Sequence, residues 1–214
     1  MTVLLTGATG YLGGYVLTEL LASTDETVVV QLRPRKDPLA HLWRATQSRL
    51  CGHEFAAAIR SGRVRVVLGE LSQSGLGVGA AEYDQLTECV DGVIHCAAAV
   101  NRRSEHACAQ GNLGACLQLV RFAQDLLRRG RLRRFVHVST VSVAGVRHHE
   151  DVSEDDMVDL QRQDYDCYGR TKKMAERMVR ELIDPSRLVI VRPSMVIGDS
   201  QTYETTQFHM LGTF

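Results

Sequence analysis

The sequence predicts a doubly wound α/β domain, in which helices cover both faces of a mostly parallel sheet. Two observations lead to this prediction. Short β-branched runs alternate with stretches of helical length along the chain, and three glycines stand between the first predicted strand and the first predicted helix. Parallel neighbours cannot be joined by a tight turn, so each connection of helical length indicates a crossover. The 214 residues are enough for one such domain.

Six strands and five helices follow from the local patterns. The strands are short β-branched or apolar runs at residues 2–6, 27–32, 63–68, 93–96, 133–139 and 187–192. The helices are expected at residues 11–22, 38–59, 82–89, 105–129 and 164–183. Two stretches are predicted to be loops: residues 71–80, which are rich in glycine and serine, and residues 146–163, which are polar and aperiodic.

Composition excludes several classes of protein. The 25 basic residues balance the 25 acidic ones, so net charge gives no reason to expect nucleic acid or an anionic membrane as a partner. The longest nearly apolar stretch, residues 93–100, is too short to span a bilayer, and no basic region typical of a secretory signal follows Met1. The six cysteines show no zinc-type spacing. We therefore expect a cytoplasmic protein with reduced thiols and no bound metal.

The three glycines predict a phosphate-binding turn. Gly7, Gly10 and Gly13 are spaced G-x-x-G-x-x-G between the first strand and the first helix. Glycine there permits a tight turn and a close approach of backbone amides to a pyrophosphate, while the helix N-terminus supplies partial positive charge. In this context the motif is typical of a Rossmann domain that binds a dinucleotide.

The end of the second strand favours NADP(H) over NAD(H). An acid about 20 residues after the glycines would bind the ribose 2′-hydroxyl, whereas an arginine accommodates a 2′-phosphate. Gln31 stands at this position, and Arg33, Arg35 and Lys36 follow. Arg33, the basic residue nearest the strand, is the first candidate to bind the 2′-phosphate.

A tyrosine, a lysine and a threonine form the candidate catalytic group. Tyr168 and Lys172 are one helical turn apart and therefore share a face, where an ammonium would lower the pKa of the phenol. Thr140 follows the fifth strand, at the edge of the sheet where α/β proteins bind ligands. Its hydroxyl can stabilise charge on a carbonyl oxygen, with Ser139 and Ser142 as nearby competitors.

These residues resemble the extended short-chain dehydrogenase/reductases. Within that superfamily the chain is most similar to the thioester reductases: terminal reductase domains of nonribosomal peptide and polyketide synthases, carboxylic acid reductases, and fatty acyl reductases of the male-sterility type. The superfamily match rests on TGATGYLG at 6–13, VIHCAAAVN at 93–101, Asn112, VST at 138–140, YGRTK at 168–172 and RP at 192–193. The narrower match rests on LR at 32–33, GELS at 69–72 and GDS at 198–200.

The resemblance implies NADPH-dependent reduction of an acyl or peptidyl thioester held on a carrier protein. Hydride adds to the thioester carbonyl, Thr140 and Tyr168 hold or protonate its oxygen, and the hemithioacetal collapses to an aldehyde, with an alcohol as the product of a second reduction. Lys172 grips the nicotinamide ribose, Glu70 contacts the adenine and Asn101 lies beside the nicotinamide or substrate. The implied cofactor-binding residues are Gly7, Thr9, Gly10, Tyr11, Leu12, Gly13, Arg33, Glu70, Leu71, Ala97, Ala98, Asn101, Tyr168, Lys172 and Pro193.

Two departures from the family keep alternatives open. Glu70 stands where the family usually has aspartate, and the sequence ends at Phe214, where extended members continue into a largely helical substrate-binding part. We expect residues 1–214 to be an NADP-binding Rossmann domain that lacks most of that part, as a fragment or a shortened member. The alternatives are a sugar-nucleotide epimerase or dehydratase, a carbonyl reductase, or a non-catalytic NADP-binding domain. His95, inside a strand, is expected to be a packed core residue.

Overall fold

The computed structural model describes residues 1–155 and 158–200, and it confirms the predicted doubly wound α/β fold. Six parallel strands form one sheet in the order β3-β2-β1-β4-β5-β6. The strands are β1 (Thr2–Thr6), β2 (Thr27–Leu32), β3 (Val64–Leu68), β4 (Gly92–His95), β5 (Arg134–Val138) and β6 (Leu188–Val191). The strand order reverses between β1 and β4, and ligands of open α/β sheets bind beside such a reversal, at the carboxyl ends of the strands.

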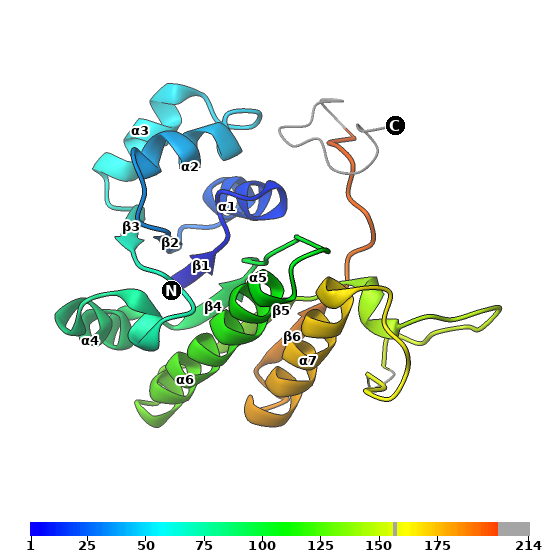
Figure 1. Ribbon diagram of the computed structural model, residues 1–214. Helices are drawn as coiled ribbons and strands as arrows, with labels where there is room; N and C mark the ends of the chain where they lie inside the picture. The colour runs from blue at the N-terminus through cyan, green and yellow to red at the C-terminus, as the bar shows by residue number, and fades with distance from the viewer. Residues whose placement is uncertain (156–157, 201–214) are drawn as a thin grey trace.

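Helices cover both faces of the sheet (Figure 1). One face carries α1 (Tyr11–Ser23), α2 (Pro38–Thr46) and α3 (Gly52–Arg60), and the other carries α4 (Ala80–Cys89), α6 (Ala115–Arg128) and α7 (Cys167–Leu182). Neighbouring residues of a strand point to opposite faces, so Leu4 and Leu5 of β1 belong to two separate hydrophobic clusters. Each side of the sheet therefore has its own core.

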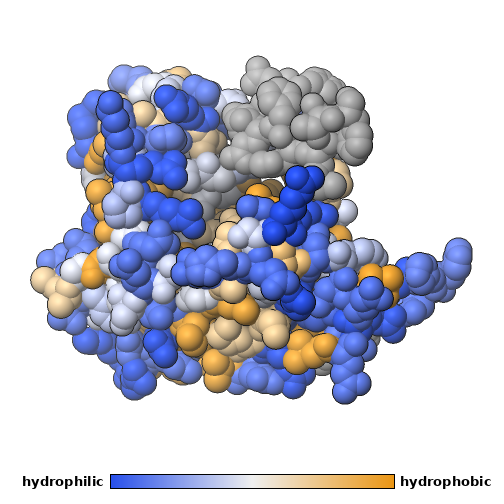
Figure 2. Space-filling model, in the orientation of Figure 1, coloured by the Kyte–Doolittle hydropathy of each residue, from blue (hydrophilic) through white to orange (hydrophobic). Residues whose placement is uncertain are grey.

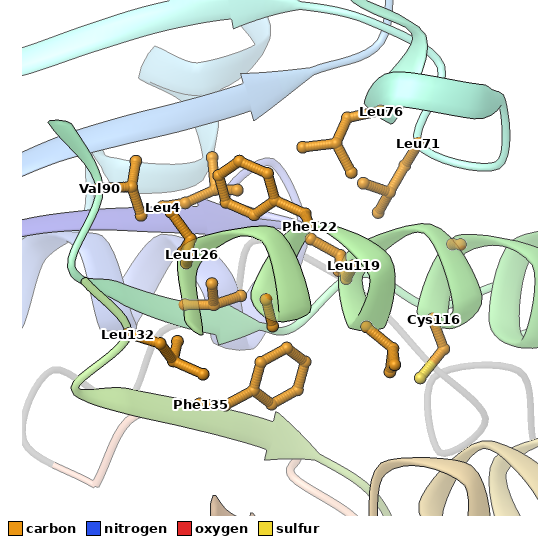
Figure 3. Close-up of a cluster of buried hydrophobic side chains, with 14 of the residues drawn as sticks. Leu4, Leu71, Leu76, Val90, Cys116, Leu119, Phe122, Leu126, Leu132 and Phe135 are labelled. Atoms are coloured by element: carbon orange, nitrogen blue, oxygen red, sulfur yellow. The ribbon is translucent and has the colours of Figure 1, made fainter. Parts of the chain in front are cut away.

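The larger core lies between α6 and the sheet (Figure 3). Leu119, Phe122 and Leu126 lie one helical turn apart on α6 and pack against Leu4 of β1 and Phe135 of β5. All five side chains are fully buried. On the outer surface, Figure 2 shows mostly hydrophilic residues, with apolar residues gathered between α6 and α7.

Two of the predicted helices are interrupted. The segment predicted as one helix over residues 38–59 forms α2 and α3, because each part has its own N-terminal cap. Asp37 accepts a hydrogen bond from the amide of Ala40, and the Glu54 carboxylate accepts one from the amide of Cys51. The segment predicted as a helix over residues 105–129 contains the short helix α5 (Glu105–Cys108), the π-helical turn η2 (Ala109–Gly114) and then α6.

The two predicted loops are confirmed over their described residues, and the first of them contains one short helical turn. Residues 71–80 include the 3₁₀ turn η1 (Ser74–Gly77), and a second 3₁₀ turn, η3 (Val141–Ala144), follows β5. Within residues 146–155 and 158–163, no helix or strand forms. None of the helices in the described ranges has the length and apolar character needed to cross a membrane.

After β6 the chain leaves the sheet and returns toward the side of α1 (Figure 1). Its course is fixed by an ion pair between Asp199 and Arg49, in which Oδ2 and Nη2 are 2.6 Å apart. Arg49 lies in the connection between α2 and α3. The Asp199 side chain is almost fully buried in this contact. The segment 192–200 therefore borders the carboxyl edge of the sheet, where the candidate site lies.

Candidate active site

A tight glycine turn joins β1 to α1. Gly7 has a φ of 77°, and a Cβ atom placed on it would lie 2.5 Å from the backbone nitrogen of Ala97. A Cβ atom on Gly13 would lie 2.1 Å from the carbonyl oxygen of Gly7. Both positions therefore need glycine. Gly10 caps α1 with no side-chain hydrogen bond among the described residues, so the first amides of the helix can bind an anion. The residues present fit the predicted pyrophosphate.

A cleft of about 520 Å³ runs along the carboxyl edge of the sheet from this turn to α7. It is lined by nearly all the residues predicted for the site: Gly7, Thr9, Gly10, Tyr11, Leu12, Gly13, Arg33, Glu70, Leu71, Ala97, Ala98, Thr140, Tyr168, Lys172 and Pro193. This volume is typical of a small-molecule or cofactor site. The structure therefore brings the glycine turn and the candidate catalytic residues into one continuous cleft.

Asn101 is the predicted site residue that the cleft does not include. Its side chain turns back to the local chain, where Oδ1 accepts a hydrogen bond from the amide of Arg103, and its carbonyl oxygen faces the thiol of Cys108. A neighbouring asparagine, Asn112, has the more central structural position. Its side chain hydrogen-bonds the amide of Ala99 at 2.8 Å and the hydroxyl of Thr171 at 2.9 Å. Asn112 thus ties the loop after β4 to α7 from within η2.

Several cleft residues had no motif of their own. Pro38 begins α2, Gly111 belongs to η2 and Ser194 follows the end of β6. The parallel topology could have indicated the residues at strand ends, since these ends meet at one edge. Gly111 could not have been found this way, because the π-helical turn that positions it was not predicted.

One end of the cleft carries the residues predicted to select the cofactor. The Nε atom of Arg33 lies 3.5 Å from the Glu70 carboxylate, and both side chains are partly exposed. Arg35 lines the same region. The side chain of Gln31 is buried and donates to the carbonyl oxygen of Gly69, so it is turned away from solvent. The last residues of β2 include no acid that could bind the ribose 2′-hydroxyl of NAD(H).

The other end carries Thr140, Tyr168 and Lys172. Asp166 caps the N-terminus of α7, accepting a hydrogen bond of 2.8 Å from the amide of Gly169, and this cap fixes the turn that bears Tyr168. Lys172 is buried, and its ammonium donates to the carbonyl oxygen of Val138 at 2.5 Å. Burial lowers the pKa of Lys172 to about 8.

The pKa of Tyr168 differs in direction from the prediction. Burial raises it above its usual value, and this effect outweighs two opposing ones, a hydrogen bond from the Thr140 hydroxyl and the positive charge of Arg102. From the sequence, Lys172 was the cation expected to lower this pKa. In the structure, Arg102 is the cation that acts on the phenol, and the phenol keeps its proton at neutral pH.

Arg102 is held against the ring of Tyr168 by contacts with the start of α7. Its guanidinium carbon lies 5.8 Å from the ring centroid, and its Nη1 atom lies 3.2 Å from the Asp166 carboxylate. The Arg102 carbonyl oxygen also accepts a hydrogen bond from the Cys167 thiol at 3.1 Å. The sequence offers no signal that distinguishes Arg102 from Arg103.

Comparisons with known proteins agree with this geometry. The family model described as "Male sterility protein" matches residues 5–214. One of the subunits of linear gramicidin synthase from Brevibacillus parabrevis is 31% identical over 209 residues, which cover 93% of this chain and 4% of that protein. The L-2-aminoadipate reductase large subunit of Penicillium chrysogenum is 30% identical over 221 residues, with coverage of 95% and 15%.

A solved structure extends the likeness to three dimensions. The terminal R domain from the myxalamid PKS-NRPS biosynthetic pathway superposes with a TM-score of 0.83 at 28% sequence identity. The alignment covers 96% of this chain and 52% of that domain. The chain thus spans about half of the R domain and a small part of the two larger relatives.

Proposed function

The chain belongs to the male-sterility and thioester-reductase family of NAD(P)-binding domains, and from this premise we propose that it reduces acyl or peptidyl thioesters held on a carrier protein, with NADPH as the reductant. One observation carries the proposal. A single cleft joins a glycine turn suited to a pyrophosphate with a threonine, a tyrosine and a lysine suited to carbonyl reduction. The cofactor and the thioester carbonyl can therefore meet in one site.

Arg33 would provide the preference for NADPH. Its ion pair with Glu70 is partly exposed and 3.5 Å long, and a pair of this kind contributes about 0–1 kcal/mol. A 2′-phosphate carries more charge and more acceptor oxygens than one carboxylate, so it can compete for the guanidinium. Glu70 would then be free to contact the adenine. Binding of NADPH and NADH to the parent protein and to Arg33→Ala tests this assignment.

Thr140 and Tyr168 would act on the thioester oxygen. When NADPH is bound, its nicotinamide supplies the hydride. The Thr140 hydroxyl holds the carbonyl oxygen, and the Tyr168 phenol, kept protonated by burial, can donate a proton to it. Loss of the carrier thiol leaves an aldehyde, and a second round of reduction would give an alcohol.

Lys172 would bind the ribose of the cofactor. Its ammonium group already donates to the Val138 carbonyl oxygen, and an ammonium has three donors, so it can bind a ribose hydroxyl as well. With a pKa of about 8, Lys172 is mostly protonated at pH 7. We therefore assign Lys172 a role in positioning the cofactor.

The test is NADPH oxidation with an acyl thioester, followed by absorbance. We expect Tyr168→Phe to lower kcat by about 100-fold or more while NADPH affinity stays within about twofold of the parent, because general acid catalysis contributes roughly that much. Tyr165→Phe, an exposed tyrosine three residues earlier, is the matched control and should retain parental turnover. Equal turnover in Tyr168→Phe and the parent would refute the assignment.

Two outcomes would favour the alternatives. A parent protein that binds NADPH but oxidises it with no acyl thioester would support a non-catalytic NADP-binding domain. Faster turnover of free ketones or aldehydes than of thioesters would support a carbonyl reductase.

A further inference from the structure

Three potential metal ligands meet in the core beneath the cleft. His95 ends β4, His137 lies opposite it in the register of β5, and Cys116 projects from α6 into the interior (Figure 3). One ligand atom from each residue lies within 4.8 Å of the other two. All three residues are buried, with exposed fractions of 1%, 0% and 0% in the order His95, His137 and Cys116.

His137 shows a second, independent feature of a binding site. Neither of its ring nitrogens has a hydrogen-bond partner among the described residues, although the ring is fully buried. An unpaired polar atom is costly to bury, so such an atom in a native protein calls for an explanation, for example a bound ion. His95 is already oriented, because the Thr6 hydroxyl lies 2.9 Å from its Nδ1 atom. Metal-binding histidines are commonly oriented by such a partner.

The ligand types suit a transition metal. Neutral imidazole nitrogens and a cysteine sulfur are ligands of zinc and of copper, and the thiol gives up its proton when a metal binds.

We propose that His95, His137 and Cys116 form a metal site of the His₂Cys type, which takes a late first-row transition ion and prefers copper to zinc. Zinc needs a fourth ligand, from the protein or from water. Copper accepts a trigonal His₂Cys set with at most a weak axial ligand, and the three residues present supply this trigonal set. Bonds of about 2.0–2.3 Å place trigonal ligand atoms roughly 3.5–3.7 Å apart, so the side chains need to draw together by about 1 Å at most.

This site was not expected from the sequence, because the cysteine and histidine spacing shows no zinc-type pattern. The three ligands come from two adjacent strands and a helix, so their proximity depends on the strand order and has no local motif. The site is also separate from the proposed reductase chemistry, because none of the three ligands lines the cleft.

Titration of the full chain with Co(II) tests the proposal, since Co(II) does not oxidise thiols and gives a sulfur-to-metal charge-transfer band. We expect the band to saturate at one ion per chain. Loss of a group that only orients a metal ligand weakens metal binding by about 10–100-fold, so loss of a ligand itself should weaken it further. Cys116→Ala should therefore remove the band and weaken binding by more than about 100-fold. Thr6→Val, which removes the hydroxyl beside His95 and leaves the three ligands in place, should weaken binding by about 10–100-fold and keep the band.

Two control variants identify the ligand. Cys89→Ser changes a half-buried cysteine on α4 and should bind Co(II) as the parent does. Cys108→Ser tests the competing thiol pair, because the sulfur atoms of Cys108 and Cys167 lie 3.7 Å apart. The absence of a band in the parent, or a band that survives Cys116→Ala but disappears in Cys108→Ser, would overturn the proposal. Should Cys116→Ala fail to fold, parental Co(II) affinity in Thr6→Val would overturn it too.

Discussion

Replacing Lys172 with methionine should stabilise the fold while it weakens cofactor binding. Burial holds the pKa of Lys172 at about 8, against 10.5 for a free lysine. One pKa unit corresponds to about 1.4 kcal/mol, so holding the ammonium in the folded protein costs about 3 kcal/mol at pH 7. Methionine removes this cost and also the hydrogen bond to the Val138 carbonyl oxygen, which contributes about 1 kcal/mol. We therefore expect a net gain of about 2 kcal/mol in the free energy of unfolding.

The sign of the pH dependence follows from proton linkage. Between pH 8 and pH 10.5 the unfolded chain binds the lysine proton more strongly than the folded one, so the stability of the parent rises with pH in this window. The advantage of Lys172→Met should be full below pH 8 and should disappear as the pH approaches 10.5. Urea unfolding of both proteins at about pH 7 and about pH 10 measures this difference.

Lys173 provides a matched control on the same helix. It is equally buried, but its ammonium lies 2.6 Å from the Asp164 carboxylate and donates to the Arg162 carbonyl oxygen at 2.9 Å. Lys173→Met leaves a half-buried carboxylate without its partner and should destabilise the fold by about 3 kcal/mol. The two variants should thus change stability in opposite directions. Destabilisation by Lys172→Met that is equal at both pH values would show that the burial argument is wrong.

Two other substitutions test the ends of the cleft. Arg102→Ala should raise the pKa of Tyr168, because a positive charge beside the ring favours the ionised phenol. Arg103→Ala should leave this pKa unchanged, and the tyrosinate absorbance of each variant, minus that of its Tyr168→Phe counterpart, measures the shift. The parent should bind NADPH at least about tenfold more tightly than NADH, and Arg33→Ala should reduce this preference, because a charge-assisted hydrogen bond contributes about 1.5–3 kcal/mol. Fluorescence titration with both cofactors measures the preference. Equal affinities of the parent for NADPH and NADH would contradict the prediction.

The sequence predicted the elements that depend on local patterns. All six strands form within about two residues of their expected bounds, because alternating strand and helix patterns act locally. The glycine turn was predictable for the same reason: Gly7 and Gly13 are needed by the backbone path itself. Most of the predicted cleft residues follow from the rule that strand ends meet at one edge.

What the sequence could not predict depends on contacts between distant segments. The π-helical turn forms where Asn112 bridges the loop after β4 to α7, and no local pattern signals that bridge. The role of Arg102 depends on the cap of α7, and the group of His95, His137 and Cys116 depends on the strand order. The pKa of Tyr168 was predicted in the wrong direction because a helical spacing gives no measure of burial.

A single turnover with labelled cofactor is the most direct test of thioester reduction by this chain. The protein is mixed with an acyl thioester on a carrier protein and with NADPH that carries deuterium on the transferring face of the nicotinamide, and the released product is analysed by mass spectrometry. We expect an aldehyde, or an alcohol, with deuterium on the former thioester carbon. Unchanged thioester, or a free acid without deuterium, would contradict it.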